Sequence, residues 1–231
     1  MSIVARRERE KKKRRRDIIN AAEKLFFFRG YDYVSMKDIS LEAELSKATL
    51  YLYFQNKESL FFAIVFRGTR ILNSMIREAV EKEDKGINRV DAFRKAYHEF
   101  TKQYPDYIQI YNYFQSGRFN LASENRRTEN HADVSIPFVR GCTMEILKLR
   151  KEMFLILCNS VQRGIDDGTI RQDLDPVEVA VLLSAISKSL SHVPPDHEKV
   201  LESCGITLEK YFMDVGEIIQ HMLTIIHGMK K

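Results

Sequence analysis

The chain lacks most of the features by which an enzyme, a metalloprotein or a disulfide-stabilised protein is recognised. It has no tryptophan and only three cysteines, none of them in a C-x-x-C pair. Its six histidines show no metal-ligand spacing, and the sequence contains neither a nucleophile motif nor a phosphate-binding glycine loop. We therefore expect a protein that is not an enzyme and that has no metal and no cofactor.

A long apolar run is also missing. No uninterrupted apolar segment approaches the ~20 residues that a membrane-spanning helix needs, and the N-terminus is charged almost from the start, unlike the apolar core of a signal peptide. Cys142 and Cys158 would lie ~24 Å apart along one helix, which is too far for a disulfide. We expect a cytoplasmic protein with no membrane partner and with reduced core thiols at these positions and at Cys204.

Proline and glycine are scarce, with five and ten residues respectively, and they fall at plausible helix boundaries. Between these boundaries the apolar residues recur at helical spacing, and no run of strands is evident. The pattern predicts an all-α fold of about nine helices. The clearest helices are predicted over residues 14–29, 57–82, 87–104, 176–192 and 207–229.

Positive charge is concentrated at the N-terminus. Residues 1–16 contain nine Lys or Arg and two Glu, so this segment carries a net +7 while the whole chain carries +5. The rest of the chain is therefore nearly neutral, with a net −2. We expect residues 1–13 to form a disordered basic arm. It can lie along DNA phosphates or enter a minor groove, and a solvated tail is the alternative interpretation.

A pattern typical of a helix-turn-helix begins at Ser35. This residue can cap a short helix, with Asp38 three residues later as the reciprocal half of a capping box. Ser46 can cap a second short helix that runs through Tyr53, and Asn56 can cap a third. Two short helices joined by a turn of three or four residues place the second helix in the major groove of DNA.

The residues of this segment, and of the helix before it, have a spacing known from one protein family. They are Ile18-Ile19, Ala21-Ala22, Leu25-Phe26, Arg29-Gly30-Tyr31, Asp38-Ile39, Ala43, Ser46-Lys47, Thr49-Leu50-Tyr51, Tyr53-Phe54, Lys57-Glu58 and Leu60. Roughly residues 14–65 resemble the N-terminal domain of the TetR family of one-component transcriptional regulators. Two positions depart from the family pattern, because Glu44 replaces its turn glycine and Ala48 replaces the glycine before the threonine. Glu44 must accept a positive φ or alter the turn.

The resemblance implies that this domain binds DNA. The predicted DNA-binding residues are Ser35, Lys37, Ser46, Lys47, Thr49, Tyr51, Tyr53 and Lys57. Among them, Lys47 and Thr49 are expected to enter the groove, and Ser46 is expected to cap the recognition helix. The others are expected to contact the DNA backbone, with Lys57 holding a phosphate at the start of its helix.

The domain organisation that follows is a basic arm (1–13), a helix-turn-helix domain (14–60) and a larger helical domain (61–231). The resemblance implies that the larger domain receives a small-molecule effector and forms a homodimer through the last two long helices. A candidate pocket for an apolar or aromatic effector consists of Phe93, Tyr97, Tyr107, Tyr111, Phe114, Met144 and Met153. Ordinary core, with tyrosine tips at the surface, is the alternative interpretation of each of these side chains.

Together these features predict a dimeric, sequence-specific transcriptional regulator that binds a palindromic operator in double-stranded DNA. The family resemblance implies a repressor that a small molecule releases from this operator. The alternative is a non-specific architectural nucleic-acid-binding protein that acts through its basic arm. That protein would bind any duplex and would be unaffected by Lys47→Ala or Tyr51→Ala.

Overall fold

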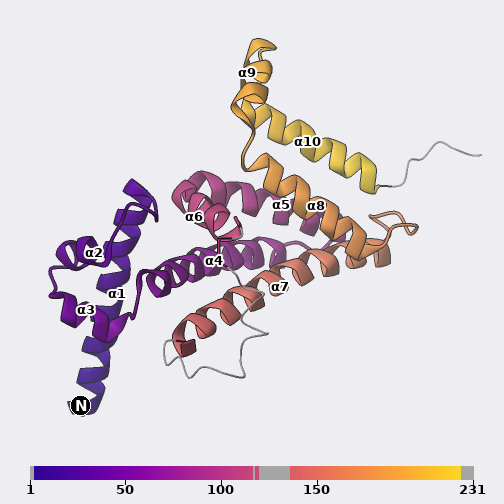
Figure 1. The fold of residues 1–231 in the computed structure, drawn as a ribbon. Helices are drawn as coiled ribbons and strands as arrows, with labels where there is room; N and C mark the ends of the chain where they lie inside the picture. The colour runs from indigo at the N-terminus through magenta and orange to yellow at the C-terminus, as the bar shows by residue number, and fades with distance from the viewer. Residues whose placement is uncertain (1–2, 117, 120–135, 225–231) are drawn as a thin grey trace, which may run out of the picture. The chain divides into compact units, whose positions relative to one another are not determined.

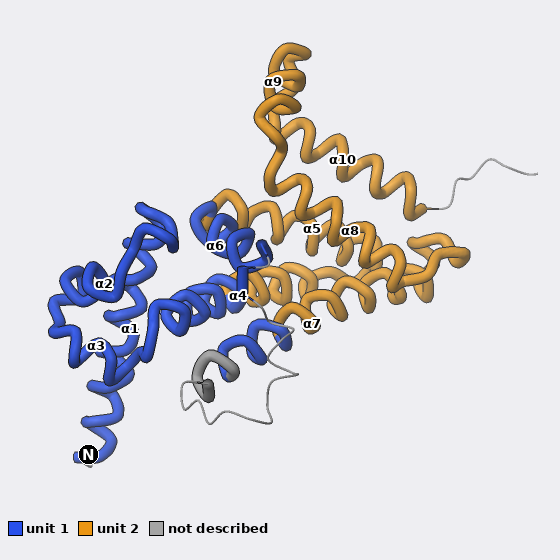
Figure 2. Tube along the Cα trace, viewed as in Figure 1, with its two compact units in different colours: residues 1–70, 105–148 blue, residues 71–104, 149–231 orange. Residues whose placement is uncertain are grey.

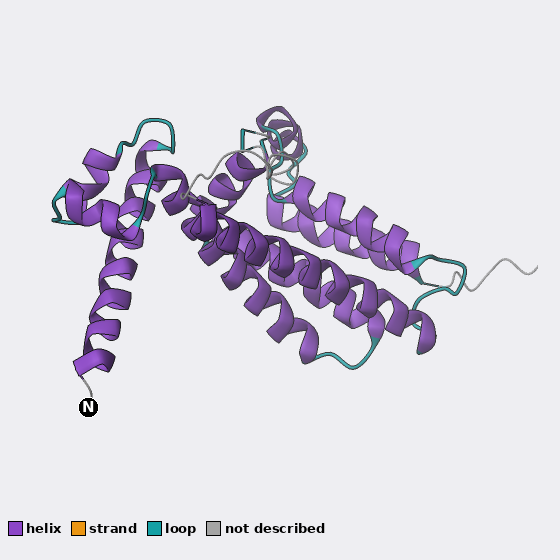
Figure 3. Cartoon of the chain, turned by 60° about the horizontal axis from the view of Figure 1, so that its bottom comes forward, coloured by secondary structure: helices purple, strands orange, loops and turns teal. Residues whose placement is uncertain are grey.

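The computed structural model describes residues 3–116, 118–119 and 136–224, and these residues form ten helices and no strand (Figure 1, Figure 3). The predicted all-α class is therefore confirmed. The helices are α1 (Ile3–Arg29), α2 (Met36–Glu42), α3 (Lys47–Tyr53), α4 (Lys57–Glu81), α5 (Gly86–Gln103), α6 (Pro105–Gln115), α7 (Ile136–Asp166), α8 (Pro176–Leu190), α9 (Pro195–Ser203) and α10 (Leu208–Leu223). The predicted end of the last helix near Met229 lies outside the described residues.

The chain divides into two compact units (Figure 2). Unit 1 contains residues 1–70 and 105–148, and unit 2 contains residues 71–104 and 149–231. The long helices α4 and α7 each have one part in unit 1 and the other part in unit 2. This division differs from the predicted boundary at residue 60, because α6 and the first part of α7 group with the N-terminal helices. The assignment of DNA binding and ligand binding to separate domains stays a prediction.

Unit 1 has an apolar core built by α1, α2, α3 and the start of α4. Helix α1 contacts α2 and α6, and α2 contacts α3. The buried side chains in this core include Ile18, Leu25, Phe26, Val34, Ile39, Leu50, Phe54, Leu60 and Phe61. Leu50 on α3 and Ile39 on α2 are fully buried, so each short helix is anchored by one large apolar residue while its other faces stay accessible.

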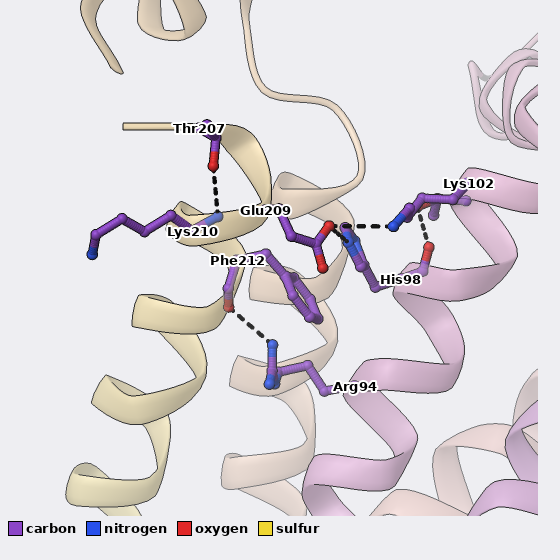
Figure 4. Close-up of polar contacts among 8 residues, drawn as sticks. Arg94, His98, Lys102, Thr207, Glu209, Lys210 and Phe212 are labelled. Atoms are coloured by element: carbon purple, nitrogen blue, oxygen red, sulfur yellow. Dashed lines mark hydrogen bonds and ion pairs between the residues drawn. The ribbon is translucent and has the colours of Figure 1, made fainter. Parts of the chain in front are cut away.

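Unit 2 is centred on α5, which contacts both α8 and α10. Figure 4 shows the polar side of the α5–α10 contact. Arg94 is 7% exposed, and its Nη1 donates to the backbone carbonyl of Phe212 at 3.0 Å. The guanidinium carbon lies 4.0 Å from the centre of the Phe212 ring, and Asp91 neutralises the charge at 2.8 Å. An added Cβ at Gly216 would lie 2.4 Å from Nη2 of Arg94, so a larger residue at that point of α10 would require the guanidinium to move.

A second close approach in unit 2 joins the start of α5 to the end of α7. An added Cβ at Gly86 would lie 1.9 Å from the backbone nitrogen of Gly164. The backbone N–H of Gly86 donates to Oδ2 of Asp167 at 2.7 Å, and the N–H of Ile87 donates to Oγ1 of Thr169 at 3.2 Å. The turn after α7 therefore caps the first residues of α5.

Helix α1 begins earlier than the sequence pattern predicts. The disordered arm is expected over residues 1–13, whereas the structure continues α1 back to Ile3. This segment contains no glycine or proline, and Lys, Arg and Glu are good helix formers. The side chains of Arg6 and Glu10, one turn apart, form an exposed ion pair at 2.9 Å, which favours the helical conformation.

Helix α4 is the one helix in the described residues that is long and apolar enough for a membrane span by length and composition. In the protein, however, 67% of the relevant window is buried. A buried core helix meets the same criterion. The apolar character of α4 is therefore explained by packing, with Leu60 and Ile64 fully buried in its first part.

The three cysteines are free. Cys142 and Cys158 are buried on α7, as expected, and burial raises the pKa of the Cys142 thiol to about 11. Cys204 is exposed at the end of α9, so its predicted place in the core is wrong. The error arises because α9 buries none of its own residues.

Candidate nucleic-acid interface

The helix-turn-helix begins with a complete capping box on α2. The N–H of Asp38 donates to Oγ of Ser35 at 3.2 Å, and the N–H of Ser35 donates to Oδ2 of Asp38 at 2.8 Å. Hydrogen bonds from Ser35 lower the pKa of the Asp38 carboxyl. The capping role predicted for Ser35 is confirmed. Because Oγ of Ser35 also contacts Oδ2 at 2.5 Å, this hydroxyl is already bound within the protein.

Helix α3, the predicted recognition helix, is capped by Ser46 as expected. The N–H of Thr49 donates to Oγ of Ser46 at 3.1 Å, and the two hydroxyls lie 2.8 Å apart. Leu50 is fully buried beneath the helix. This single anchor fixes which face of the seven-residue helix points outward.

The residues predicted to contact the DNA groove or the DNA backbone differ in solvent exposure. Lys47 on α3 and Lys37 at the start of α2 are exposed. Tyr51 is 49% exposed, whereas Thr49 and Tyr53 are half-buried. Lys47 and Tyr51 therefore have the freedom to reach a duplex, and the DNA roles assigned to all these residues stay predictions.

Lys57 has a different environment from the one expected. It was predicted to hold a phosphate at the start of α4, but it is half-buried. Its Nζ donates to the backbone carbonyl of Tyr31 at 2.8 Å and lies 4.2 Å from the centre of the Tyr31 ring. Burial, together with Glu58, raises the pKa of Tyr31 to about 12. In this conformation Lys57 joins α4 to the segment after α1.

The turn between α2 and α3 resolves the question raised by the missing glycine. Glu44 has a φ of 53°, the one positive φ among the non-glycine residues that the structure describes. The side chain is exposed, and the N–H of Leu45 donates to the carbonyl of Ser40 at 2.8 Å. The turn therefore keeps its left-handed conformation, and Glu44 accepts the strain.

Helix α1 extends the basic surface of unit 1. Its N-terminal residues, from Ile3 to Arg14, are all exposed. Further along, the guanidinium carbon of Arg15 lies 4.7 Å from the centre of the Phe54 ring, directly beyond the end of α3. The predicted basic segment is therefore helical and continuous with the helix that supports the recognition helix.

Helix α6 is tied by polar contacts to α1 and to the loop that follows α1, and the sequence did not predict these contacts. The hydroxyl of Tyr107 donates to the carboxylate of Glu23, which also accepts from Arg67 at 2.6 Å. Similarly, the hydroxyl of Tyr113 donates to Asp32 at 2.8 Å. Burial and the contact with Glu23 raise the pKa of Tyr107. No sequence spacing signals these pairs, because the partners lie more than 80 residues apart.

The seven residues predicted as an effector pocket are divided between the two units. Tyr107, Tyr111, Phe114 and Met144 belong to unit 1, and Phe93, Tyr97 and Met153 belong to unit 2. The hydroxyl of Tyr107 donates to Glu23. The rings of Phe114 and Phe62 pack edge-on with their centres 5.7 Å apart. Met144 is 65% exposed on α7. The assignment of these seven residues to one effector pocket stays a prediction.

Unit 2 has an enclosed, mainly apolar pocket of its own. Its lining includes Phe93, Arg94, Leu157, Leu183, Ser187 and Ile219. Its free volume is about 10 Å³, enough for a single water molecule. Of the predicted pocket residues Phe93 lies here, while Tyr97 lines a neighbouring crevice beside His98 and Phe212. An effector larger than water would have to widen this pocket.

The two predicted dimer helices have both buried and exposed apolar residues. Helices α8 and α10 bury residues such as Leu183 and Ile219. They also expose Val177, Val181 and Leu182 on α8 and Leu208, Met213 and Ile218 on α10. Ile218 is 65% exposed. Surplus apolar residues on adjacent helices are typical of a protein interface.

Residues 18–64 match the protein family described as bacterial regulatory proteins of the tetR family. The HTH-type transcriptional activator FasR of Mycolicibacterium smegmatis is 31% identical over 85 residues, covering 37% of this chain and 39% of that protein. The uncharacterised HTH-type regulator YhgD of Bacillus subtilis is 23% identical over 196 residues, covering 79% and 88%. The chain thus matches well under half the length of FasR.

Solved structures show the same fold over nearly the whole chain. A TetR/AcrR-family regulator from Thermobifida fusca superimposes with a TM-score of 0.66 at 18% identity, covering 95% of this chain and all of that one. The regulator AibR, solved with isovaleryl coenzyme A and operator DNA, gives a TM-score of 0.59 at 21% identity, covering 91% and 97%. At these identities the likeness establishes the fold.

Proposed function

Because residues 18–64 form a helix-turn-helix domain of the TetR family, we propose that this protein is a sequence-specific DNA-binding transcriptional regulator that acts as a homodimer. The observation that carries the proposal is the geometry of α3. Ser46 caps this helix, Leu50 anchors it, and Lys47 stays exposed beside Tyr51. A short, anchored helix with an accessible basic and aromatic surface has the form of a major-groove reader.

The proposed dimer forms through the exposed apolar residues of α8 and α10. These valine, leucine, methionine and isoleucine side chains lie in unit 2. A two-fold dimer presents two recognition helices to one duplex, so its operator is expected to be a palindrome with half-sites ~34–36 Å apart. We place this activity in the cytoplasm, where the chromosome of a bacterium is accessible.

The sign of regulation that we propose is repression, relieved by an apolar or aromatic small molecule. Support comes from AibR, whose structure holds both isovaleryl coenzyme A and operator DNA, and from the mainly apolar lining of the pocket in unit 2. Binding would shift the population between two spacings of the paired recognition helices. FasR is named an activator, so activation is the competing sign.

The test is capture of sheared genomic DNA by the purified protein at ~150 mM salt, where non-specific phosphate contacts are weakened. Lys47→Ala is run in parallel. An enriched palindrome that disappears in the variant supports the proposal and provides the operator. Transcription from a promoter carrying that operator, measured with and without the protein, then distinguishes repression from activation.

A non-specific architectural role is the second candidate, and it is favoured by the exposed basic turns of α1. It predicts uniform recovery of genomic DNA that Lys47→Ala does not change. Deletion of residues 3–13 distinguishes the architectural role from the sequence-specific regulator. Under our proposal this deletion weakens binding to all sequences about equally and lowers the salt dependence. Loss of sequence preference in the deletion, with none in Lys47→Ala, would favour the architectural role.

A further inference from the structure

We infer that the outer face of α3 reads the C5 methyl groups of thymine through Ala48 and Leu52. The inference rests on the proposed DNA-binding function and names the sequence feature that this protein would recognise. Neither residue is among the DNA contacts predicted from the sequence. Both are identified by where the fold places them.

The geometry follows from the position of Leu50. This residue is fully buried, so it marks the inner side of the helix. Ala48 and Leu52 are each two positions away from it, and at about 100° per residue each lies roughly 160° around the axis from Leu50. They are also four residues apart and therefore neighbours on one face. The surface that points most directly away from the core is thus apolar.

Exposure agrees with this placement. Leu52 is 82% exposed, compared with 49% for Tyr51 on the same helix. Ala48 is exposed as well. Lys47 and Tyr51 flank this pair on one side, while Thr49 and Tyr53 lie on the other, half-buried. An apolar strip between hydrogen-bonding side chains matches what one groove of DNA offers.

The matching group is the thymine methyl. The four base pairs are distinguished in the major groove by hydrogen-bond donors, hydrogen-bond acceptors and one apolar group, the C5 methyl of thymine. Apolar side chains select thymine by contact with this methyl. The adjacent charge favours a nucleic acid over a protein as occupant. Lys47 is exposed next to this strip, and nine Lys or Arg occupy residues 1–16 of the same unit.

Ala48 departs from the family pattern, which has glycine at this position. The extra methyl group lies on the outer face, where the helix would approach the base edges most closely. A glycine there would leave only Leu52 to make apolar contact. Ala48 and Leu52 together can cover two successive thymines on one strand.

The test uses the operator recovered by genomic capture, with each thymine replaced in turn by deoxyuridine. This substitution removes the C5 methyl and leaves every hydrogen-bonding group in place. Burial of one methyl contributes about 0.8 kcal/mol, which corresponds to roughly fourfold in affinity. We expect a fourfold loss at one or two thymines of each half-site, measured by fluorescence anisotropy with the wild-type protein.

Leu52→Ala is expected to weaken binding to the thymine operator and to remove the difference between thymine and deoxyuridine at one position. The matched control is Leu41→Ala, the same substitution on α2 at a site that is 66% exposed. This control should retain the full fourfold difference. Thermal unfolding of both variants checks the fold, which neither exposed side chain is expected to affect.

The outcomes separate this inference from the proposed function. If the wild-type protein enriches an operator but no deoxyuridine substitution changes its affinity, the thymine contact is wrong and the regulator stands. The thymine contact is equally wrong if Leu52→Ala binds like wild type, which would point to a protein partner for the strip. If no site is enriched at all, the proposed function itself fails.

Discussion

Helix starts are capped in two different ways, as a comparison of α2, α3 and α4 in unit 1 with α5 in unit 2 shows. In unit 1, the helices α2, α3 and α4 each begin directly after the residue whose side chain caps them, as when the N–H of Ser59 donates to Oδ1 of Asn56 at 2.8 Å. In unit 2, α5 follows Lys85, which provides no side-chain cap. Its first N–H groups are instead bound by Asp167 and Thr169, 81 and 82 residues later in the chain.

The difference shows what the stability of each helix start depends on. A local cap is formed as soon as its own helix forms, because both partners lie within one turn. A distant cap exists only once α5 and α7 have packed together, so its contribution depends on the tertiary structure.

The sharpest way to break the distant arrangement is Gly86→Ala. The new Cβ would lie 1.9 Å from the backbone of Gly164, so α5 and α7 would have to separate. We expect the free energy of unfolding to fall by about 3 kcal/mol, at the upper end for overpacking. The measurement is urea denaturation followed by circular dichroism.

Gly141→Ala is the matched control for this substitution. It lies on α7, where an added Cβ meets no atom within 4 Å. Replacing a helical glycine with alanine should stabilise the protein by roughly 0.5–1 kcal/mol. If both variants lose stability equally, the close approach of α5 and α7 is not the cause.

The two kinds of cap can be compared directly with Asp167→Ala and Ser35→Ala. Each should lower the free energy of unfolding by about 1–2 kcal/mol, because each exposes N–H groups at a helix start. The difference should appear in amide hydrogen exchange. Asp167→Ala is expected to accelerate exchange at Gly86 and Ile87 in unit 2, and Ser35→Ala only around α2. Faster exchange throughout the chain in both variants would contradict the distinction.

A smaller local effect is expected at Glu44. Glu44→Gly relieves a positive φ, worth about 1 kcal/mol, and part of this gain is offset by the greater freedom of glycine in the unfolded chain. The converse is Gly30→Ala, at a φ of 81° with nothing within 4 Å of the added Cβ, which should destabilise by about 1 kcal/mol. Thermal melts of the two variants should shift in opposite directions.

The smallest effect is a pH dependence of the α5–α10 contact. His98 stacks on Phe212 with ring centres 3.6 Å apart, and burial lowers its pKa below 6.5 in spite of nearby Glu209. The unfolded chain therefore binds a proton more readily than the folded one, so stability is fully present above pH 6.5 and declines as the pH falls through the folded pKa. His98→Gln should flatten this decline in denaturation curves between about pH 5 and pH 7.

The sequence predicted the helix-turn-helix in detail because its signals are local. Ser35, Ser46 and Asn56 were identified as caps from spacing alone, and each makes the expected hydrogen bond. The all-α class followed from periodicity. The inward turn of Lys57 could not be predicted, since the Tyr31 carbonyl that holds it is fixed by the packing of α1 against α4.

The surroundings of the aromatic residues were predicted less well, for the same physical reason. The aromatic residues of α5 and α6 share a helical period, which suggested one pocket, but period does not say which neighbour each face meets. Tyr107 faces Glu23, while Phe93 faces Leu157 and Leu183 around a small cavity.

The contact between Arg94 and Gly216 has a consequence for the history of this protein. The guanidinium occupies the space that a side chain on α10 would need, so a larger residue there would require the arginine to move and to give up its hydrogen bond to Phe212. Among related chains, a side chain at the second position is expected more often where the first position has a shorter residue. Two residues far apart in the gene are thereby expected to change together.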